Sequence, residues 1–489
     1  MESDEGIKIE GEGYLINRDS DKRFPVKFEV EQIRTGKISG KCTLSGFEYE
    51  DILNPSQLKN CRCISGELIK ISVYEMQEYI LENFRKSHLK GETNNRDEVI
   101  INDIFTYGCQ TNFSESRSER SLNLKFSAGK VEVSCETISI KDQFWIKYGI
   151  INLDLRRLLR GCIETDIGKI TFSTWKDHKE VIEEMKTFKT PLLSGFLNIT
   201  DVNIGNFESF DSYLKTVVDD TIEKVLELLS LAQSTYLSHC SVRIYAKTSN
   251  SNSQDDYKLK KLIMRDIKTK APSLGQPLIK DLVDIYKFIS PKTFQKYTDL
   301  REKFDLNIAF EWYLNSLSSD LQSRYLQAFT VLELLKDRYN KEIGNEYILP
   351  ESSFEEYLPD LKEKINEVLK EKEVNNKKRK KISGNLMGIN RTSFPNSLGR
   401  LLKDHHIVYG NLFSDFKIMK DTRDQIIHRG IQEIDSKELL DAYQRLICLI
   451  QRIFLALLEY DGYFLDRNDK YKRKKFTDFR IGDFARTPE

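Results

Sequence analysis

Apolar and polar residues alternate through much of residues 1–205, with the period of two that a strand shows when one face is buried. The stretches that carry this alternation, broken by Gly turns, are GIKIEGEGYLI, PVKFEVEQI, KISGKCTLSG, NLKFSAGKVEVSCETISI and KITFST. The letters SAGK at 127–130 predict a hairpin turn between two of these strands. Because a sheet with one apolar face needs an opposing layer, we expect a sandwich or a barrel-like domain.

The period changes to that of a helix after this region. SYLKTVVDDTIEKVLELLSLAQSTYL carries a broad apolar stripe at helical spacing. A short strand, SVRIYAK, follows it, and GQPLIKDLVDIYKFI again has a helical pattern. Residues 206–300 are therefore expected to be a mixed, mainly helical linking region.

Residues 301–465 have the pattern of a helical bundle. The first long helix, in SSDLQSRYLQAFTVLELLKDRY, has one apolar face, made of Leu321, Tyr325, Ala328, Phe329, Leu332 and Leu335. The other helices are expected in SFEEYLPDLKEKINEVLKEK, FSDFKIMKDTRDQIIH and ELLDAYQRLICLIQRIFLALLEY. Two long apolar helices and two shorter amphipathic ones suit an antiparallel arrangement.

The last helix of this bundle has a clear start signal. Asp435 is a good N-cap residue, Glu438 stands three positions later, and Ile434 can contact Leu439 as a hydrophobic staple. Residues 466–489 then read as a basic C-terminal tail. The predicted fold class is α+β and multidomain, with a β-rich domain first and a helical bundle second.

Charge and composition restrict the functional classes. The chain has 76 basic and 76 acidic residues, so its net charge of zero argues against a protein that covers nucleic acid with its whole surface. A local basic patch is still compatible with this balance. The acidic start, MESDEGIKIEGEG, has no signal-peptide pattern, and no apolar run approaches the length of a membrane span. We expect a cytoplasmic protein that does not bind membranes.

The eight cysteines are scattered along the chain. Cys61 and Cys63 form a C-x-C pair with no second Cys or His pair at zinc spacing. Reduced cytosolic thiols are therefore favoured over a metal site, and no metal or other cofactor is expected.

The stretch TRDQIIHRG carries the candidate chemistry. The buried face of its helix is expected to consist of Phe416, Met419, Ile426 and Ile427. Arg423 is four residues after Met419 and falls on the same face, where a guanidinium is costly unless it is paired. Its partner could be Glu333, in the apolar run TVLELL, or the phosphate of a ligand.

His428 lies five residues after Arg423, about 140° around an ideal helix, so the two side chains point in different directions. Gly430 is a candidate C′ residue, which places His428 in the last turn, where backbone carbonyls favour a protonated ring. Asp424 precedes His428 by four residues and could orient the ring and raise its basicity. These features suit an acid–base histidine.

A purely structural explanation is also open. Arg423 could form only an ion pair with Glu333, and His428 could be a helix-capping residue. The same spacing occurs in GRLLKDHH, with Arg400, His405 and the adjacent His406.

The arrangement as a whole resembles the HEPN superfamily. Its motif is Arg, four to six residues and His, often with a polar residue after the Arg, and Arg423, Asp424 and His428 fit this motif. SRYLQAFTVLELL resembles the first long helix of these domains. A β-rich half followed by such a bundle is similar to the ApeA-like HEPN proteins of bacterial anti-phage defence.

This resemblance implies a metal-independent endoribonuclease that acts as an anti-phage, abortive-infection effector. His428 would transfer the proton and Arg423 would stabilise the phosphate, with Asp424 and Glu333 in support. Two bundles would pair as a homodimer to form one cleft. RNA is the implied partner, with transfer RNA among the candidates, and a phage-derived trigger would act through the β-rich half. The competing function is a non-catalytic protein that binds a ligand or RNA, in which Arg423 is structural.

Two basic runs could bind an RNA backbone near that cleft. The residues concerned are Lys377, Lys378, Arg379, Lys380, Lys381, Lys472, Arg473, Lys474 and Lys475. Tyr471 and Phe476 could stack on bases. The alternative for each run is charge that is simply solvated on a loop.

Overall fold

The computed structural model divides the chain into two compact units, which are described separately. The sheet unit comprises Met1–Leu274 and Asp281–Pro291, and the helical unit comprises Gly275–Lys280 and Lys292–Glu489. The described residues are 6–17, 23–45, 61–73, 98–102, 105–113, 120–134, 138, 142–154, 162–174, 178–202, 204, 207–247, 257–267, 270, 272, 276–410, 412–414, 416–429 and 435–479. None of the helices in these ranges is long and apolar enough to cross a membrane.

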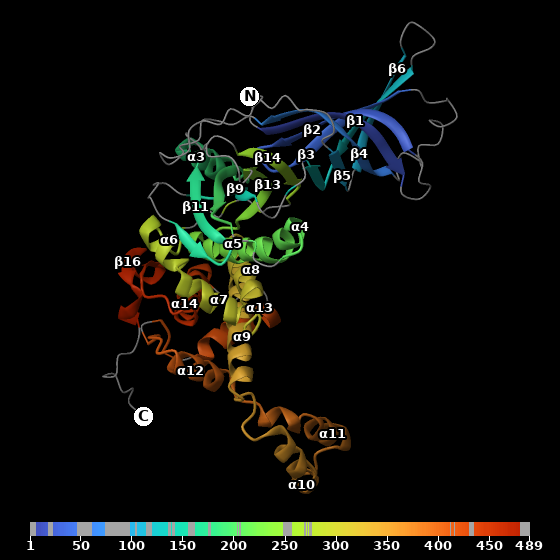
Figure 1. Cartoon of the computed structure of the whole chain (residues 1–489). Helices are drawn as coiled ribbons and strands as arrows, with labels where there is room; N and C mark the ends of the chain where they lie inside the picture. The colour runs from blue at the N-terminus through green and yellow to red at the C-terminus, as the bar shows by residue number, and fades with distance from the viewer. Residues whose placement is uncertain are drawn as a thin grey trace. The chain divides into compact units, whose positions relative to one another are not determined.

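The sheet unit is built on one antiparallel sheet (Figure 1). Its strands are β1 (Gly6–Asn17), β2 (Arg23–Ile33), β3 (Ile38–Ser45), β4 (Cys61–Val73), β5 (Glu98–Asn102), β6 (Phe105–Phe113), β7 (Arg120–Ser127), β8 (Lys130–Ser134), β9 (Gln143–Ile151), β10 (Ile163–Thr165), β11 (Gly168–Thr174), β12 (Leu193–Thr200), β13 (Ser238–Lys247) and β14 (Lys258–Arg265). Their order across the sheet is β10-β11-β12-β9-β13-β14-β8-β5-β4-β1-β2-β3-β7-β6. The expected α+β class, with a large N-terminal sheet and a C-terminal helical region, is confirmed.

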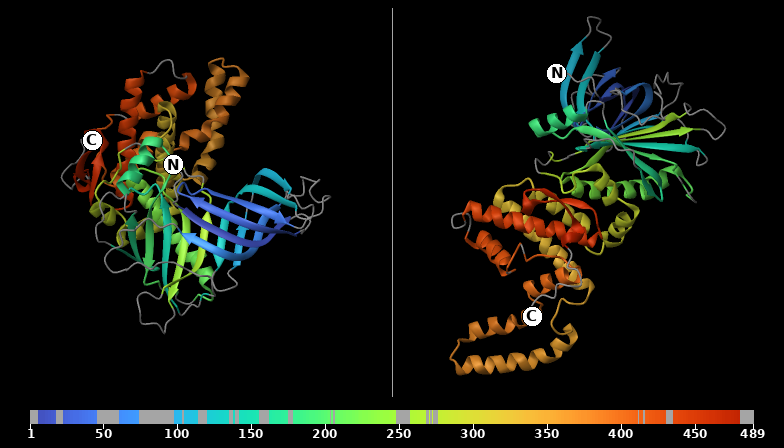
Figure 2. Two further views of the ribbon diagram at one scale, coloured as in Figure 1. Left: turned by 90° about the horizontal axis from the view of Figure 1, so that it is seen from above. Right: turned by 90° about the vertical axis from the view of Figure 1, so that its left-hand side faces the viewer.

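The alternation seen in the sequence produces the curved part of this sheet. Along β2, Phe24, Val26, Phe28 and Val30 are buried and the residues between them are more exposed. One core collects side chains from β14 and β8 together with side chains from β3 and β7, although four strands separate these pairs in the sheet order. This part of the sheet therefore curls around its own core, as the left view of Figure 2 shows.

The hairpin predicted at 127–130 is wrong. β7 pairs with β3 and β6, whereas β8 pairs with β5 and β14. The connection is held instead by bonds to other parts of the sheet: Ala128 N donates to the carbonyl of Ile38 (3.3 Å) and Asp266 N donates to that of Gly129 (2.8 Å). The turn letters indicate a short connection correctly, but the pairing depends on distant strands that local letters do not specify.

The region expected to link the domains completes the sheet. The predicted strand SVRIYAK lies in β13, and β14 follows it. The predicted helix is present as α4 (Phe210–Tyr213), a π-helical turn η1 (Leu214–Val218) and α5 (Asp219–Gln233). The unit also contains α3 (His178–Phe188) and α6 (Leu282–Phe288). The elements α4, η1, α5, β13, β14 and α6 thus belong to the sheet unit.

A partly buried polar network lies between α5 and the sheet. Arg265 NH1 donates to His239 Nε2 (2.8 Å), and Arg265 NH2 forms an ion pair with Asp219 (3.1 Å). Tyr148 donates its hydroxyl to Asp219 (3.0 Å) and packs at its ring edge against His239. A guanidinium can only donate, so His239 Nε2 accepts and the neutral ring carries its proton on Nδ1. Burial, with the nearby Arg265 charge, lowers the pKa of His239 to about 4.

This low pKa predicts acid sensitivity of the sheet unit. The unfolded histidine has a pKa of about 6.5, so the unfolded state binds more protons between about pH 6.5 and 4. The free energy of unfolding should therefore fall as the pH drops through this window, by up to about 3 kcal/mol. Denaturant unfolding across this range should show the loss, and a His239→Gln variant should show a flatter profile. An unchanged profile in that variant would contradict the assignment.

The helical unit contains the predicted bundle and helices that the sequence did not reveal (Figure 2, right). Its helices are α7 (Pro291–Arg301), α8 (Leu306–Ser316), α9 (Leu321–Glu342), α10 (Glu351–Glu371), α11 (Asn376–Gly384), α12 (Phe394–Asp404), α13 (Lys417–Arg429) and α14 (Ser436–Leu457). On α9 the expected face is buried, except that Leu321 is half-buried. Asp435 caps α14 by accepting from Lys437 N (3.1 Å), while Ile434 lies outside the described residues.

The segment expected to be a basic tail is folded as far as Phe479. It forms a hairpin of β15 (Tyr463–Asp466) and β16 (Lys472–Lys475), with short helical turns at Arg467–Asp469 and Phe476–Phe479. Lysines and arginines fill β16, but their long side chains lie on the outer side while Phe476 and Phe479 are buried. The sequence therefore looks like a solvated tail although the segment packs on the unit.

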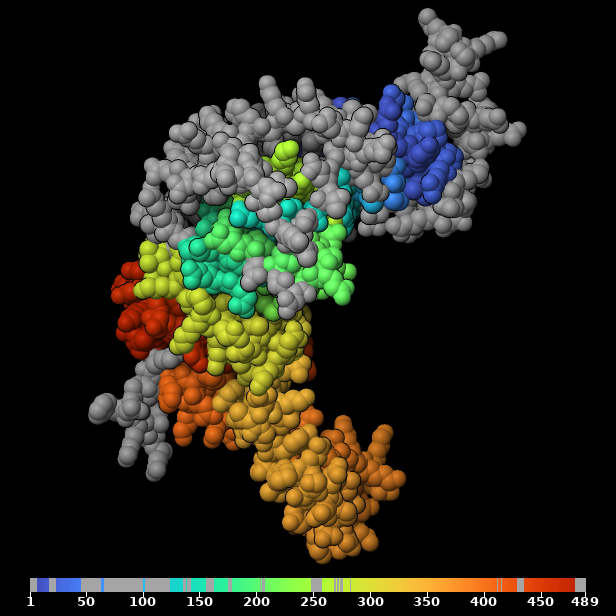
Figure 3. Space-filling model, viewed as in Figure 1, coloured from blue at the N-terminus to red at the C-terminus, as the bar shows by residue number. Residues whose placement is uncertain are grey.

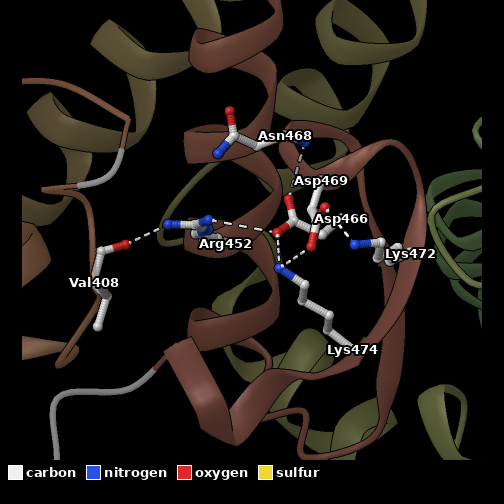
Figure 4. Close-up of polar contacts among 7 residues, drawn as sticks. All are labelled: Val408, Arg452, Asp466, Asn468, Asp469, Lys472 and Lys474. Carbon is white, nitrogen blue, oxygen red and sulfur yellow. Dashed lines mark hydrogen bonds and ion pairs between the residues drawn. The ribbon is translucent and has the colours of Figure 1, made fainter.

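A buried arginine holds this hairpin against α14 (Figure 4). Arg452 has a fully buried side chain; its NH1 donates to Val408 O (2.6 Å) and its NH2 lies 3.9 Å from Asp466 Oδ2. Asp466 also accepts from Lys474 Nζ (3.2 Å) and from Asn468 N (3.0 Å). The guanidinium lies 4.3 Å from the centre of the Phe479 ring. Burial lowers the pKa of Arg452, and the Asp466 carboxylate opposes this fall.

Candidate functional site

Arg423, in the middle of α13, is held by three groups. Its NH1 donates to Asp424 Oδ1 at 2.6 Å, and its NH2 lies 3.8 Å from Glu333 Oε2 on α9. The guanidinium carbon lies 5.6 Å from the centre of the Phe329 ring, within the range of a cation–π contact. The side chain is still 31% exposed, so it is restrained without being closed off.

The two carboxylates differ in their surroundings. Burial raises the pKa of Glu333, although the Arg423 charge opposes this rise. The hydrogen bond from Arg423 lowers the pKa of Asp424, so this carboxylate is ionised at neutral pH. The expected pairing of Arg423 with Glu333 is present, at a longer distance than the pairing with Asp424.

The buried face of α13 is narrower than expected. Met419 is fully buried, and Tyr325 on α9 donates its hydroxyl to the Met419 carbonyl (2.9 Å). Phe416 and Ile426 are half-buried, but Ile427 is 51% exposed, so its predicted burial is wrong. The last turns of α13 are not covered by the other described helices of the unit, since Gln425 and His428 are exposed there as well, and Ile427 lies four residues after Arg423. An apolar side chain is thus exposed next to the guanidinium.

His428 is exposed in the last turn of α13, and Gly430 lies outside the described residues. Asp424 binds Arg423 directly, and the nearby His428 also helps to lower the pKa of Asp424. The role predicted for Asp424, orienting the His428 ring, stays a prediction. His428 points away from the side of α13 that faces α9, as the 140° separation from Arg423 requires.

The second Arg–His pair, Arg400 and His405, takes part in contacts that join α12 to α9. Arg400 Nε donates to Asp404 (2.7 Å) within α12, and Tyr339 donates its hydroxyl to the same carboxylate (2.7 Å). The ring of His405 packs at 5.2 Å on that of Tyr339. Burial and the Asp404 carboxylate raise the pKa of Tyr339. These contacts fix the end of α12 to α9.

The two basic runs differ in how far their side chains pair with carboxylates or rings of the protein. On α11 the side chains of Lys377, Lys378, Lys380 and Lys381 are exposed and Arg379 is half-buried. On β16, Lys472 pairs with Asp469 (3.1 Å), Lys474 pairs with Asp466 and Asp469, and Arg473 lies over the Tyr463 ring. Lys475 is exposed. The carboxylates reduce the charge that β16 can offer to an anion.

The aromatic residues of the second run also differ from each other. Phe476, expected to stack on bases, is fully buried against Phe464, so that expectation is wrong. Tyr471 is exposed, with Arg467 at 5.6 Å from its ring centre. Sequence reasoning also missed Phe329. Its position four residues before Glu333, on the same side of α9, was the available signal.

The region that contains Arg423 and His428 is similar to a known protein family. A model of the family Apea-like HEPN matches residues 326–461. The helical unit therefore contains an Apea-like HEPN domain. The resemblance to ApeA-like HEPN proteins inferred from the sequence is confirmed. No curated protein matches the chain. Glu333, Arg423, Asp424 and His428 all lie within the HEPN domain, and so does α11, whereas β16 follows it.

Proposed function

We propose that this protein is a metal-independent endoribonuclease of the HEPN type, with Arg423 and His428 as its catalytic residues. HEPN domains are generally ribonucleases, and the motif lies inside the matched domain. The observation that carries the proposal is the state of Arg423: two carboxylates and a ring orient its guanidinium, yet part of it is open to a ligand. A phosphate would find a fixed fork of donors there.

The proposed chemistry needs only these groups and the RNA. The ribose 2′-hydroxyl attacks the adjacent phosphorus and loses its proton, and the bond to the 5′-oxygen of the next nucleotide breaks as that oxygen gains a proton. His428 transfers protons as general base or acid. Arg423 stabilises the negative charge that develops on the phosphoryl oxygens. The products are a cyclic 2′,3′-phosphate and a 5′-hydroxyl, and DNA is resistant because it lacks the nucleophile.

In this proposal the catalytic site contains Arg423 from one copy of the chain and His428 from a second copy. Arg423 and His428 diverge on one helix, so one chain does not direct both side chains at one phosphate. Two HEPN domains related by a two-fold axis can set Arg423 of one opposite His428 of the other. The exposed apolar residues Ile418 and Ile427 on α13, and Leu440 on α14, support a contact at this place.

The sheet unit is proposed to regulate the nuclease. An RNA-cleaving effector in the cytoplasm would be toxic to its own cell, and a trigger from an infecting phage would release it. Transfer RNA is one candidate substrate. These proposals rest on the family resemblance, not on any catalytic group in the sheet unit.

Substitutions at Arg423 test the catalytic assignment. Arg423→Ala should lower the rate of RNA cleavage by about 100- to 1,000-fold, because the transition state loses a hydrogen-bond donor. Arg423→Lys keeps the charge but loses the planar fork, and should recover only a small part of the rate. Cleavage of a labelled RNA under single-turnover conditions measures both. Full activity of Arg423→Ala would refute the proposed role.

The pairing of Arg423 with Asp424 and Glu333 also suits a second, non-catalytic function. If Arg423 serves only to join α13 to α9, the protein would be a non-catalytic module that binds a ligand or RNA. The Asp424 and Glu333 contacts are compatible with that function. In that case Arg423→Ala would lower stability, and wild-type protein would show no cleavage that the variant could lose.

The proposed RNA contacts can be ranked from the structure. Lys377→Gln should weaken RNA binding and lower the slope of log affinity against log salt by about 0.7 for the one phosphate that is no longer neutralised. Lys472→Gln should have a smaller effect, because Asp469 already pairs with that lysine. Binding of labelled RNA at several salt concentrations, with an inactive His428→Ala background, gives both values. Equal effects of the two changes would contradict the ranking.

A further inference from the structure

The proposed cleavage moves two protons, one from the attacking 2′-hydroxyl and one to the departing 5′-oxygen. In an in-line displacement these two oxygens lie on opposite sides of the phosphorus. A single imidazole cannot reach both of them in one step, so His428 fills only one of the two roles. If the chain is the proposed ribonuclease, a second group beside the phosphate has to fill the other.

Glu333 on α9 lies beside the guanidinium that would hold this phosphate. Its Oε2 is 3.8 Å from Arg423 NH2, which is too long for a hydrogen bond. α9 reaches the surface of the helical unit along part of its length, seen in yellow to light orange in Figure 3, and the Glu333 side chain is 37% exposed. A phosphate on Arg423 would bring its 2′-hydroxyl close to a carboxylate oxygen that is not hydrogen-bonded to that arginine.

The surroundings of Glu333 make it a stronger base than an ordinary glutamate. Burial raises the pKa of Glu333 above its ordinary value of 4.5. The charges of Arg423 and Lys336 oppose this rise, while those of Asp337 and Asp424 add to it. A carboxylate whose pKa is raised binds a proton more tightly, and a general base works best when its pKa lies near the operating pH.

The other charged groups around the guanidinium are engaged differently. Asp424 accepts from Arg423 at 2.6 Å, and this bond lowers its pKa, so Asp424 is the weaker base of the two carboxylates. Lys336 pairs with Asp337 at 2.5 Å and, as an ammonium group, has no lone pair that could accept a proton. Asp424 therefore suits the orientation of Arg423, and Glu333 suits proton transfer.

We propose that Glu333 is a catalytic residue, the general base that removes the proton of the 2′-hydroxyl, while His428 of the second copy is the general acid. The 2′-oxygen forms its bond to phosphorus as its proton passes to a carboxylate oxygen of Glu333. The bond between phosphorus and the 5′-oxygen breaks as that oxygen takes a proton from the His428 imidazolium. Arg423 holds the phosphoryl oxygens between the two groups. Proton exchange with water then returns both groups to their starting states.

A sulfur leaving group separates the base from the acid. The probe is a short RNA that the full-length wild-type protein cuts at one mapped linkage, made with sulfur in place of the bridging 5′-oxygen at that linkage. A thiolate leaves without being protonated, so this RNA needs the base but not the acid. His428→Ala should cut the sulfur RNA at close to the wild-type rate, whereas Glu333→Gln should be slower than wild type by about 100-fold or more on both RNAs.

Three results would overturn this assignment. If the sulfur RNA rescues Glu333→Gln, Glu333 is the acid. If it does not rescue His428→Ala, that histidine is not the acid. If Glu333→Gln cuts ordinary RNA at the wild-type rate while Arg423→Ala does not, Glu333 is not catalytic and the proposed function still stands. A wild-type protein that cuts no RNA would instead refute the proposed function, and the role of Glu333 with it.

The pH dependence separates a base from a residue that only positions Arg423. A base acts when deprotonated, so the single-turnover rate should rise with pH through the raised pKa of Glu333, above pH 4.5. This rising limb should vanish in Glu333→Gln and persist in Glu333→Asp, which keeps a carboxylate. Asp424→Asn is the matched control: it removes the other carboxylate that contacts Arg423, and should lower the rate without removing the limb. A slower Glu333→Gln with an unchanged limb would overturn the proposal, because Glu333 would then only position Arg423.

Discussion

Replacement of His428 by alanine is expected to abolish RNA cleavage and to change the free energy of unfolding by less than about 1 kcal/mol. The side chain is exposed at the end of α13. Its removal therefore costs little packing. Proton transfer by a placed side chain typically contributes about 100- to 10,000-fold to a rate, and cleavage would disappear with it. The assay is single-turnover cleavage of labelled RNA, with stability measured by denaturant unfolding.

His405→Ala is the matched control for this result. His405 packs on Tyr339 at the end of α12, so its removal should lower stability more than the removal of His428 while cleavage by the folded protein persists. If His405→Ala is inactive and His428→Ala is active, the other Arg–His pair is the catalytic one. Cleavage that is abolished by EDTA would contradict the metal-independent mechanism.

The second large effect is expected at Asp466. Asp466→Ala should destabilise the helical unit by about 3–5 kcal/mol, because it leaves the Arg452 charge buried without its carboxylate. Asp469→Ala is the control: it also pairs with Lys474 but is more exposed, and should destabilise the unit much less than Asp466→Ala. Denaturant unfolding followed by a probe in the helical unit compares them. Equal, small effects would show that the Arg452 network is not what holds the hairpin.

The sequence predicted local structure better than pairing. Strands β1, β2, β3, β7, β8 and β11 and the helices α9, α13 and α14 were visible as periods of two and of 3.6, whereas β4, β5, β6, β9 and β12 were not predicted. The curl of the sheet was not, because it depends on which distant strands pair, as the connection at 127–130 shows. The hairpin of β15 and β16 was also missed, since the four consecutive basic residues of β16 show no alternation of apolar and polar positions.

The candidate site was predicted in part. Helical spacing placed Arg423 on the apolar face of its helix, and Glu333 lies in an apolar run of another helix, so their pairing was expected. The structure brings the two groups to 3.8 Å. The Phe329 ring beneath the guanidinium was missed, because an aromatic residue on an apolar stripe looks like ordinary core. The exposure of Ile427 could not be predicted, since it depends on how widely α13 contacts α9.

Mixing two inactive variants tests the central claim most directly. Arg423→Ala retains His428, and His428→Ala retains Arg423, so a mixed pair contains one complete site only if the two residues act across the interface. If the chains exchange freely, the mixture should recover about a quarter of the wild-type rate of RNA cleavage. A mixture as inactive as either variant alone would contradict a site shared between two copies.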